Sequence, residues 1–396
     1  MGASPRARRH RRRRHHRPTP DAPQRGRRPH RREVHRLSRH DLELGAEHAA
    51  TREQLWNAVL DGDEYAAAAA VFAAIDRGVS AEVVLLEVIA PVQHRVGTEW
   101  AANRITVAEE HAATAINDRV IAALAHHPAS APTTTCGRVT VACVDGEWHA
   151  LPARLLAEVL RLRGWQVDFL GAQVPTPHLI AHLHRTGPVA VALSCSIPTR
   201  LPTAHAAITA CQAAGVPVIA GGAAFAPDGR HARRLGADAW GPDARVAADL
   251  LGRGLTRDHH TSAHQPIDDL PHLGDQEYTM VGRTAPQLVK ATVGDLEDRF
   301  PAMRTYTERQ RQHTTEDIAH IVDFLATALY LDDDDLFTGF VTWTADILAA
   351  RGVPATSLHP ALESLQAQLV EFPRTQRLLN AALTALDHTA DMEQIV

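Results

Sequence analysis

Residues 137–164, GRVTVACVDGEWHALPARLLAEVLRLRG, read as a buried strand, a short loop and an amphipathic helix. The run VTVACV is almost continuously apolar, which is typical of a strand covered on both faces of a parallel sheet. The loop that follows it carries Glu147, Trp148 and His149. Because such loops open on the edge of a parallel sheet where ligands bind, we expect His149 to face a ligand.

The same alternation continues through the middle of the chain. Further short apolar runs occur at 167–172, 189–196, 216–222 and 237–241. Helices are predicted over 151–163, 176–185, 200–214, 228–235 and 243–251. Short apolar strands that alternate with helices predict an α/β fold, with a flavodoxin-like doubly wound parallel sheet of five strands.

Helical periodicity dominates on both sides of this block. Leu55, Val59, Val71 and Ile75 recur at helical spacing, so the preceding segment is predicted to be a four-helix bundle. Similar stripes predict a C-terminal all-α domain. The predicted segments are a disordered Arg/His-rich tail over 1–47, the helical bundle over 48–127, the sheet domain over 133–253, a linker over 254–282 and the C-terminal helical domain over 283–396.

Composition describes a soluble protein of the reducing cytoplasm. The 396 residues are 45% hydrophobic and 22% charged, and no apolar run reaches the length of a membrane span or resembles a secretory signal. The cysteines show neither metal-ligand spacing nor disulfide density, which is typical of reduced thiols. These cysteines are Cys136, Cys143, Cys195 and Cys211.

Charge is unevenly distributed along the chain. The N-terminal tail contains RARRHRRRRHHR and RGRRPHRR, yet the whole chain has a net charge of −5, so the remainder is strongly acidic. An acidic remainder argues against a folded nucleic-acid-binding face, which leaves the tail as the segment able to bind phosphates. The other interpretations of the tail are a disordered leader or sequence upstream of a misassigned start.

Glu147 lies two residues before His149, close enough for its carboxylate to accept a hydrogen bond from the imidazole. A carboxylate in this position fixes the tautomer of the ring and raises the basicity of the other ring nitrogen, as it does for histidines that ligate metals. The other interpretation is an ordinary loop histidine. The pattern favours His149 as a metal ligand once the neighbouring loops are considered.

Small residues end two further strands, with Ser194 and Ser196 on one and Gly221 and Gly222 on the other. Their loops open on the same edge and let a long ligand lie close to the backbone. This order of a His loop, a Ser loop and a Gly-Gly loop resembles the cobalamin-binding domain shared by methionine synthase, corrinoid proteins and cobalamin-dependent mutases. The resemblance implies that His149 replaces the cofactor's benzimidazole as the lower cobalt ligand. It also implies that the nucleotide tail lies between the Ser and Gly-Gly loops.

Some positions depart from the family pattern. The family's Asp-x-His-x-x-Gly reads here as Glu147 to Pro152, in which Glu keeps the charge of Asp with a longer reach. Pro152 suits the first turn of a helix but changes the turn beside the tail. Ser196 stands where Leu is usual. We expect these changes to leave the fold intact and to alter the affinity for the tail.

The resemblance extends into the helical bundle. Thr106 and Glu109 are predicted to form a capping box, which places Glu110 and His111 in the first turns of a helix that follows Trp100. Trp100 with Glu110 and His111 resembles the signature of the cobalamin-dependent photoreceptor regulators, whose bundle caps the upper face of adenosylcobalamin. The resemblance implies that Trp100 covers the upper ligand and that Glu110 binds the adenosyl ribose. The other interpretation is a core aromatic beside two surface residues.

The C-terminal helical domain resembles no family. Its Asp run over 332–335 lacks the alternating ligands and the glycine of a calcium loop, so we interpret it as a solvated turn that supplies an N-cap before Leu336. An apolar stripe is interpreted as core or dimer interface. It consists of Phe324, Leu325, Phe337, Phe340 and Trp343.

Taken together, these features predict a cobalamin-binding sensory or regulatory protein rather than an enzyme. Adenosylcobalamin is the favoured cofactor and light is a candidate signal, although Ala101 follows Trp100 where the photoreceptors carry the His that captures cobalt after photolysis. The C-terminal helices are expected to contact an unidentified protein partner or a second copy of the chain. One alternative is a corrinoid shuttle that carries methylcobalamin to methyltransferases. Another is an interaction scaffold without a cofactor.

Overall fold

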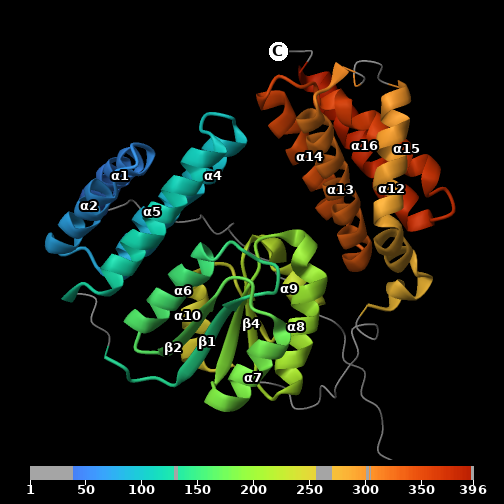
Figure 1. The fold of residues 1–396 in the computed structure, drawn as a ribbon. Coiled ribbons are helices and arrows are strands. Elements are labelled where there is room, and N and C mark those ends of the chain that lie inside the picture. Colours follow the sequence, from blue (N-terminus) through green and yellow to red (C-terminus); the bar gives the residue numbers. More distant parts are fainter. Residues whose placement is uncertain (1–38, 129–132, 256–269, 300–302, 304, 394–396) are drawn as a thin grey trace, which may run out of the picture. The chain divides into compact units, whose positions relative to one another are not determined.

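The computed structural model describes residues 39–128, 133–255, 270–299, 303 and 305–393 (Figure 1). The N-terminal tail up to residue 38 and most of the predicted linker, 256–269, lie outside the described residues. By their contacts, residues Gly45–Val396 form one compact unit, so the segments predicted as separate domains pack together.

A parallel sheet of five strands forms the centre of the fold. The strands are β1 (Arg138–Cys143), β2 (Gln166–Gly171), β3 (Ala190–Ser194), β4 (Val218–Gly221) and β5 (Ala239–Gly241). Their order, β2-β1-β3-β4-β5, is that of a doubly wound sheet, which confirms the predicted α/β fold.

The register of the sheet aligns the carboxyl ends of four strands. Cys143 pairs with Ser194, Ser194 with Gly221, and Gly221 with Gly241. The loops after β1, β3, β4 and β5 therefore leave the sheet at the same level. This alignment creates the ligand edge expected from the sequence.

Helices cover both faces of the sheet. They are α6 (Leu151–Leu162), α7 (Thr176–Thr186), α8 (Leu201–Ala213), α9 (Arg230–Arg234) and α10 (Ala244–Arg253). Successive β1 side chains point to opposite faces: Val141 joins the core that contains α6 and α10, whereas Ala142 joins the core that contains α8. Both faces are buried, which explains why β1 is almost continuously apolar.

The helical bundle before the sheet is built from α1 (Arg39–Leu60), α2 (Glu64–Asp76), a long helix and α5 (Val107–Ala125). The long helix joins α3 (Ala81–Val83), the π-helix η1 (Val84–Ile89) and α4 (Ala90–Ala101). The predicted capping box is confirmed, because Thr106 and Glu109 each accept a hydrogen bond from the other's backbone amide. Ser80 caps the start of the long helix by accepting from the Val83 amide. Helix α1 begins inside the range predicted as disordered tail.

The C-terminal helices are α12 (Glu277–Arg299), α13 (Glu308–Leu331), α14 (Asp334–Ala350), α15 (His359–Gln368) and α16 (Pro373–Glu393), with short 3₁₀ turns η5 (Pro271–Asp275) and η7 (Ala355–Leu358). The linker predicted over 254–282 is therefore too long. Glu277 is only 4% exposed because its carboxylate accepts hydrogen bonds from the Arg374 and Thr375 amides, 3.0 and 2.8 Å away, at the start of α16. Glu277 was assigned to the linker because it is polar and because the residues that bury it lie 97 and 98 positions later in the sequence.

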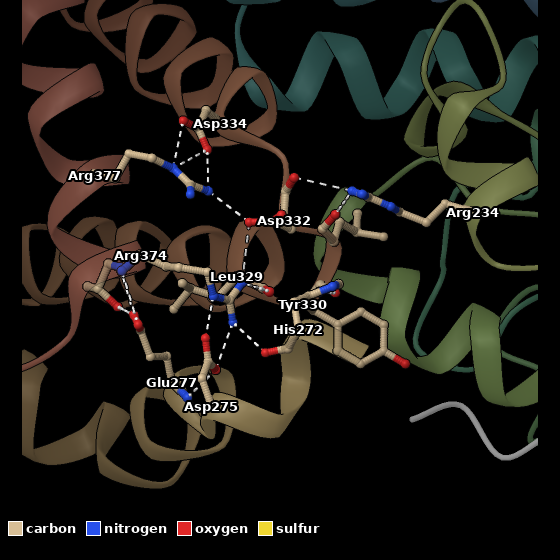
Figure 2. Close-up of polar contacts among 12 residues, drawn as sticks. Arg234, His272, Asp275, Glu277, Leu329, Tyr330, Asp332, Asp334, Arg374 and Arg377 are labelled. Atoms are coloured by element: carbon tan, nitrogen blue, oxygen red, sulfur yellow. Dashed lines mark hydrogen bonds and ion pairs between the residues drawn. The ribbon is translucent and has the colours of Figure 1, made fainter. Parts of the chain in front are cut away.

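The turn between α13 and α14 is held by charged side chains (Figure 2). Arg377 pairs with Asp332 at 2.7 Å and with Asp334 at 3.0 Å, and Arg374 pairs with Asp275. Asp333 is the predicted N-cap, accepting from the Leu336 amide. The expectation of a solvated turn is wrong, because these carboxylates have specific basic partners. Within the described ranges, no group of three or more His, Cys, Asp or Glu side chains is arranged to hold a metal.

The C-terminal helices share a hydrophobic core with the α8 face of the sheet. Inside this core His205 on α8 and Tyr330 on α13 are joined by a hydrogen bond of 2.8 Å. Among the helices that the structure describes, none is long and apolar enough to cross a membrane.

Candidate functional site

The loop between β1 and α6 brings Glu147 and His149 together. The imidazole Nδ1 of His149 lies 2.7 Å from the Glu147 Oε1 atom, and the His149 amide donates to the same oxygen at 2.8 Å. An ionised carboxylate only accepts hydrogen bonds, so Nδ1 carries the proton. The neutral ring then presents the lone pair of Nε2, the atom suited to ligate a metal.

The second oxygen of Glu147 binds the loop after β3. Oε2 accepts hydrogen bonds from the Ser196 and Ile197 amides at 2.6 and 2.8 Å. The carboxyl group is 0% exposed, and burial alone would raise its pKa. The hydrogen bonds from His149, Ile197 and Ser196 outweigh burial and hold the pKa below the usual Glu value. Glu147 therefore stays charged and ties the His loop to the Ser loop.

His149 remains open on its far side. Its side chain is 40% exposed, and its ring stacks on the exposed Trp148 with centroids 3.7 Å apart. Among the described residues, no side chain or backbone group hydrogen-bonds Nε2. The ring is thus fixed through Nδ1 and Trp148, while Nε2 is left free of protein hydrogen bonds from the described residues.

A narrow slot of about 120 Å³ opens beside this loop, between the strand ends and helices α6 and α10. Its lining includes Pro152 at the start of α6, Ser194 at the end of β3, and Gly221, Gly222 and Gly241 from the last two strands. The slot thus brings together the Ser and Gly-Gly positions singled out in the sequence. Pro152, the departure from the family pattern, lies in its wall.

The slot presents one open hydroxyl and a backbone cradle formed by glycines. The Ser194 hydroxyl is buried without a hydrogen-bond partner among the described residues, so it is available to a ligand. Gly222 has φ +102°, and a Cβ there would lie 2.3 Å from the Cys195 carbonyl oxygen. A Cβ on Gly241 would lie 2.7 Å from the Ala247 Cβ. Only glycine keeps this cradle open.

The neighbouring thiols do not compete with His149 as ligands. Burial raises the pKa of Cys143 to about 12, and the nearby Glu147 adds to the shift. Burial, again with Glu147, raises the pKa of Cys195 well above the usual value. Because only a thiolate ligates metal well, both cysteines are inert core residues.

The bundle residues form a separate group. Glu110 pairs with His111 and accepts a hydrogen bond from Thr114 at 3.0 Å, and the Thr114 hydroxyl in turn accepts from Gln93 on α4 at 2.7 Å. Trp100 is half-buried against the bundle core. Over the described residues, no hydrogen bond or ion pair joins Trp100, Glu110 or His111 to His149. The structure thus brings together the predicted residues of the sheet edge, around His149. The predicted residues of the bundle, Trp100, Glu110 and His111, lie apart from them.

Some site features were missed in the sequence. Gly241 ends β5 as Gly221 ends β4, so the search for small residues at strand ends could have found it. Arg200 follows the Ser loop, and its guanidinium lies so close to Gly146 that a Cβ there would be 3.0 Å from Nε. The Ile197 amide that binds Glu147 carries no sequence signal, because every residue has an amide.

The solved structures similar to this chain include three cobalamin-related proteins. A monomethylamine corrinoid protein from Methanosarcina barkeri is 18% identical, with a TM-score of 0.45 over 51% of this chain and 97% of that one. A cobalamin-binding protein from Desulfitobacterium hafniense DCB-2 is 21% identical, with a TM-score of 0.30 over 54% and 98%. The methanol:cobalamin methyltransferase complex MtaBC from Methanosarcina barkeri is 18% identical, with a TM-score of 0.28 over 55% and 88%.

No curated protein matches the sequence. Two family models do match, and both are described as a B12 binding domain. One covers residues 137–249, the sheet with its strand-end loops, and the other covers residues 51–125, the helical bundle. With the His loop and the slot in place at the carboxyl edge, these matches identify the chain as a cobalamin-binding protein.

Proposed function

We propose that the protein is a cobalamin-dependent sensor or regulator that uses adenosylcobalamin, with His149 as the lower cobalt ligand. The observation that carries this proposal is the buried Glu147 carboxylate, which orients His149 through Nδ1 and binds the next strand-end loop through Oε2. This arrangement fixes the ring before any ligand arrives, so little ordering remains to be done on binding.

The residues of the carboxyl edge have distinct roles in this proposal. Glu147 accepts a hydrogen bond from Nδ1 of His149, which selects the tautomer whose Nε2 carries the lone pair for cobalt. The Ser194 hydroxyl hydrogen-bonds the tail, and Gly221 and Gly222 let the tail lie against the backbone. The Ser196 amide, rather than its side chain, contributes by anchoring Glu147.

The helical bundle then covers the upper side. Bound cobalamin supplies a cobalt centre whose upper ligand can be exchanged or cleaved. Trp100 shields that ligand from water, and Glu110, oriented by Thr114 and paired with His111, accepts hydrogen bonds from the adenosyl ribose. With cobalamin bound, Trp100 and Glu110 would hold the bundle over the upper ligand, and the C-terminal helices would pass a change in that contact to a protein partner.

Purified protein loaded with adenosylcobalamin in the dark and then desalted tests the lower ligand. The wild type is expected to stay coloured. His149→Ala should show the absorption spectrum of cobalamin without an imidazole ligand. Glu147→Gln should weaken retention about 10- to 100-fold, because the ring loses its orienting carboxylate. His184→Ala, an exposed histidine on α7, is the matched control. A wild type that is colourless after desalting contradicts the proposal.

A second candidate is a corrinoid shuttle that carries methylcobalamin. One observation favours it: the exposed face of His149 and the absence of bonds from the bundle to this loop, among the described residues, leave the upper side open to a second protein. The two candidates differ in their response to light. A sensor changes spectrum and molecular mass when its adenosyl form is illuminated. A shuttle instead gives up the methyl group of its methyl form to a thiol acceptor.

A further inference from the structure

Helix α14 is anchored at its start to the sheet domain. Its N-cap, Asp333, accepts hydrogen bonds from Arg230 Nε at 2.7 Å and from His231 Nε2 at 2.8 Å. Both donors lie on α9, which follows the Gly221-Gly222 loop of the slot. The start of α14 is thus fixed beside the carboxyl edge of the sheet.

The other end of α14 is anchored to the helical bundle. The Ala350 carbonyl accepts from Asn103 Nδ2, and Arg351 donates to the Ala101 carbonyl, both at 3.4 Å. The Arg351 guanidinium also lies over the Trp100 ring, 5.6 Å from its centroid. Helix α14 has 17 residues and so spans about 25 Å. It therefore bridges the two matched cobalamin-binding regions.

Trp343 lies on α14 between these anchors. It is seven residues before Ala350, which is two helical turns, so both residues share one face of the helix. One side of the indole packs on Phe340, whose ring stacks on Phe324 on α13 at 3.7 Å. Trp343 is still 48% exposed, while Phe337, about a third of a turn away around the helix, is 0% exposed. The aromatic stripe is therefore core except for Trp343.

The helix pair that carries Trp343 lies beside the loops of the site. Helix α13 contacts the 3₁₀ turn η3 (Pro198–Arg200), which follows the Ser loop. Arg200, at the end of that turn, lies over Gly146 in the His149 loop. Trp343 and Trp148, the neighbour of His149, are also the two most exposed of the six tryptophans.

We propose that Trp343 contacts the upper axial ligand of bound cobalamin, as a wall of the site supplied by the C-terminal helical domain. The proposal rests on the proposed function, and it deepens it by adding a specificity-determining residue outside both matched regions. The half-exposed indole lies on the helix that runs from its anchor on α9, beside the slot, to its anchor at Trp100 of the bundle. A bulky, planar upper ligand such as adenosyl gains an aromatic contact there, whereas a methyl group is too small to reach it.

The test measures the affinity of Trp343→Ala and Trp343→Phe for two probes, adenosylcobalamin and methylcobalamin, in the dark. Trp343→Ala should weaken adenosylcobalamin binding about 2- to 12-fold and leave methylcobalamin unchanged, and Trp343→Phe should restore most of the loss. Circular dichroism melts establish that each variant is folded. Loading should also quench less indole fluorescence in Trp343→Phe than in Trp165→Phe, since Trp165 lies at the opposite end of the sheet.

Equal affinities of wild type and Trp343→Ala for adenosylcobalamin would overturn the proposal. An equal loss for both probes would also overturn it, because that pattern reports a contact with the corrin ring or a distorted fold. These outcomes leave the proposed function standing. Its own failure is a wild type that binds neither probe.

Discussion

The two helical regions are attached to the sheet domain in different ways. The bundle shares apolar contacts with α6, but its polar contacts are ion pairs at the edge of that contact. Arg163 pairs with Glu82 at 2.7 Å, where both side chains are part-buried, and Arg245 pairs with Glu87 at 3.1 Å, where both are exposed. A cavity of about 290 Å³ remains between the two, lined by residues that include Leu85 of the bundle. The C-terminal helices instead make buried polar contacts within a continuous core.

We call the helical bundle the detachable side of the sheet domain and the C-terminal helices its fixed side. Exposed ion pairs contribute little to stability because water and salt screen them. A cavity between two elements also means that fewer side chains pack against each other there. Buried partners such as His231 and Asp333 are costly to separate, since each would be left without its hydrogen bond. We therefore expect the bundle to move on ligand changes and the C-terminal helices to stay with the sheet.

The largest effect is expected from Asp333→Ala, which removes both an N-cap and the partner of Arg230 and His231. The free energy of unfolding should fall by about 2–4 kcal/mol in urea titrations. Asp333→Asn keeps the cap and should recover part of the loss. Asp335→Ala is the control, because Asp335 is 85% exposed, and its effect should stay within about 0.5 kcal/mol. Equal effects of Asp333→Ala and Asp335→Ala would remove the distinction between the two sides.

Tyr330→Phe removes the hydroxyl that hydrogen-bonds His205 in the buried contact between α13 and α8. We expect a loss of about 1–2 kcal/mol in the free energy of unfolding, since His205 loses that partner inside the core. Tyr65→Phe, at an 88% exposed position of the bundle, should change stability by less than about 0.5 kcal/mol. A neutral Tyr330→Phe would mean that this contact does not fix the C-terminal helices.

Acid should weaken the fixed side first. Burial alone would raise the pKa of Asp333, but His231 and Arg230 outweigh it and hold the pKa well below the usual Asp value. The contribution is therefore fully present above the unfolded pKa of about 3.9 and is lost as the pH falls towards the folded value. Asp335 also faces Arg230, at 3.7 Å. The stability difference between wild type and Asp333→Asn should shrink below about pH 4, and a constant difference would contradict this assignment.

The smallest effect is expected from Arg163→Ala on the detachable side. Its partner Asp249 is exposed and its partner Glu82 is part-buried, so solvent screens the pairs in part. Stability should fall by about 1 kcal/mol, and by less at high salt. Hydrogen exchange should speed up in the bundle and not in the C-terminal helices. A larger loss, or exchange that also speeds up in α13, would place the weak seam elsewhere.

Much of the lower site was predictable because its parts are close in sequence or follow a strand. Glu147 and His149 are two residues apart, and a loop of that length brings them together in almost any conformation. The anchoring of Glu147 to the Ser196 and Ile197 amides was not predictable, because it spans 49 and 50 residues. Pairings of that range depend on the sheet register, which places Cys143 beside Ser194.

The wrong predictions for the C-terminal region also come from contacts between residues that are distant in sequence. The Asp run predicted an N-cap correctly, since capping is local, but it did not reveal that His231 lies 102 residues away as the partner of Asp333. Glu277 was assigned to a linker because an acidic residue is usually exposed. Its burial follows from its position at the start of α16, where the backbone amides of Arg374 and Thr375 need acceptors.

By itself the sequence determined the alternation of strands and helices, the position of the His149 loop and the small residues at the strand ends. These follow from periodicity and turn chemistry, which act over a few residues. The tertiary structure alone decided which loops share Glu147, and that Ser194 is left without a protein partner. It alone decided that α14 joins the sheet to Trp100. Such contacts form only when distant segments pack, because burial turns a charge or hydroxyl that water would satisfy into a group that needs one particular partner.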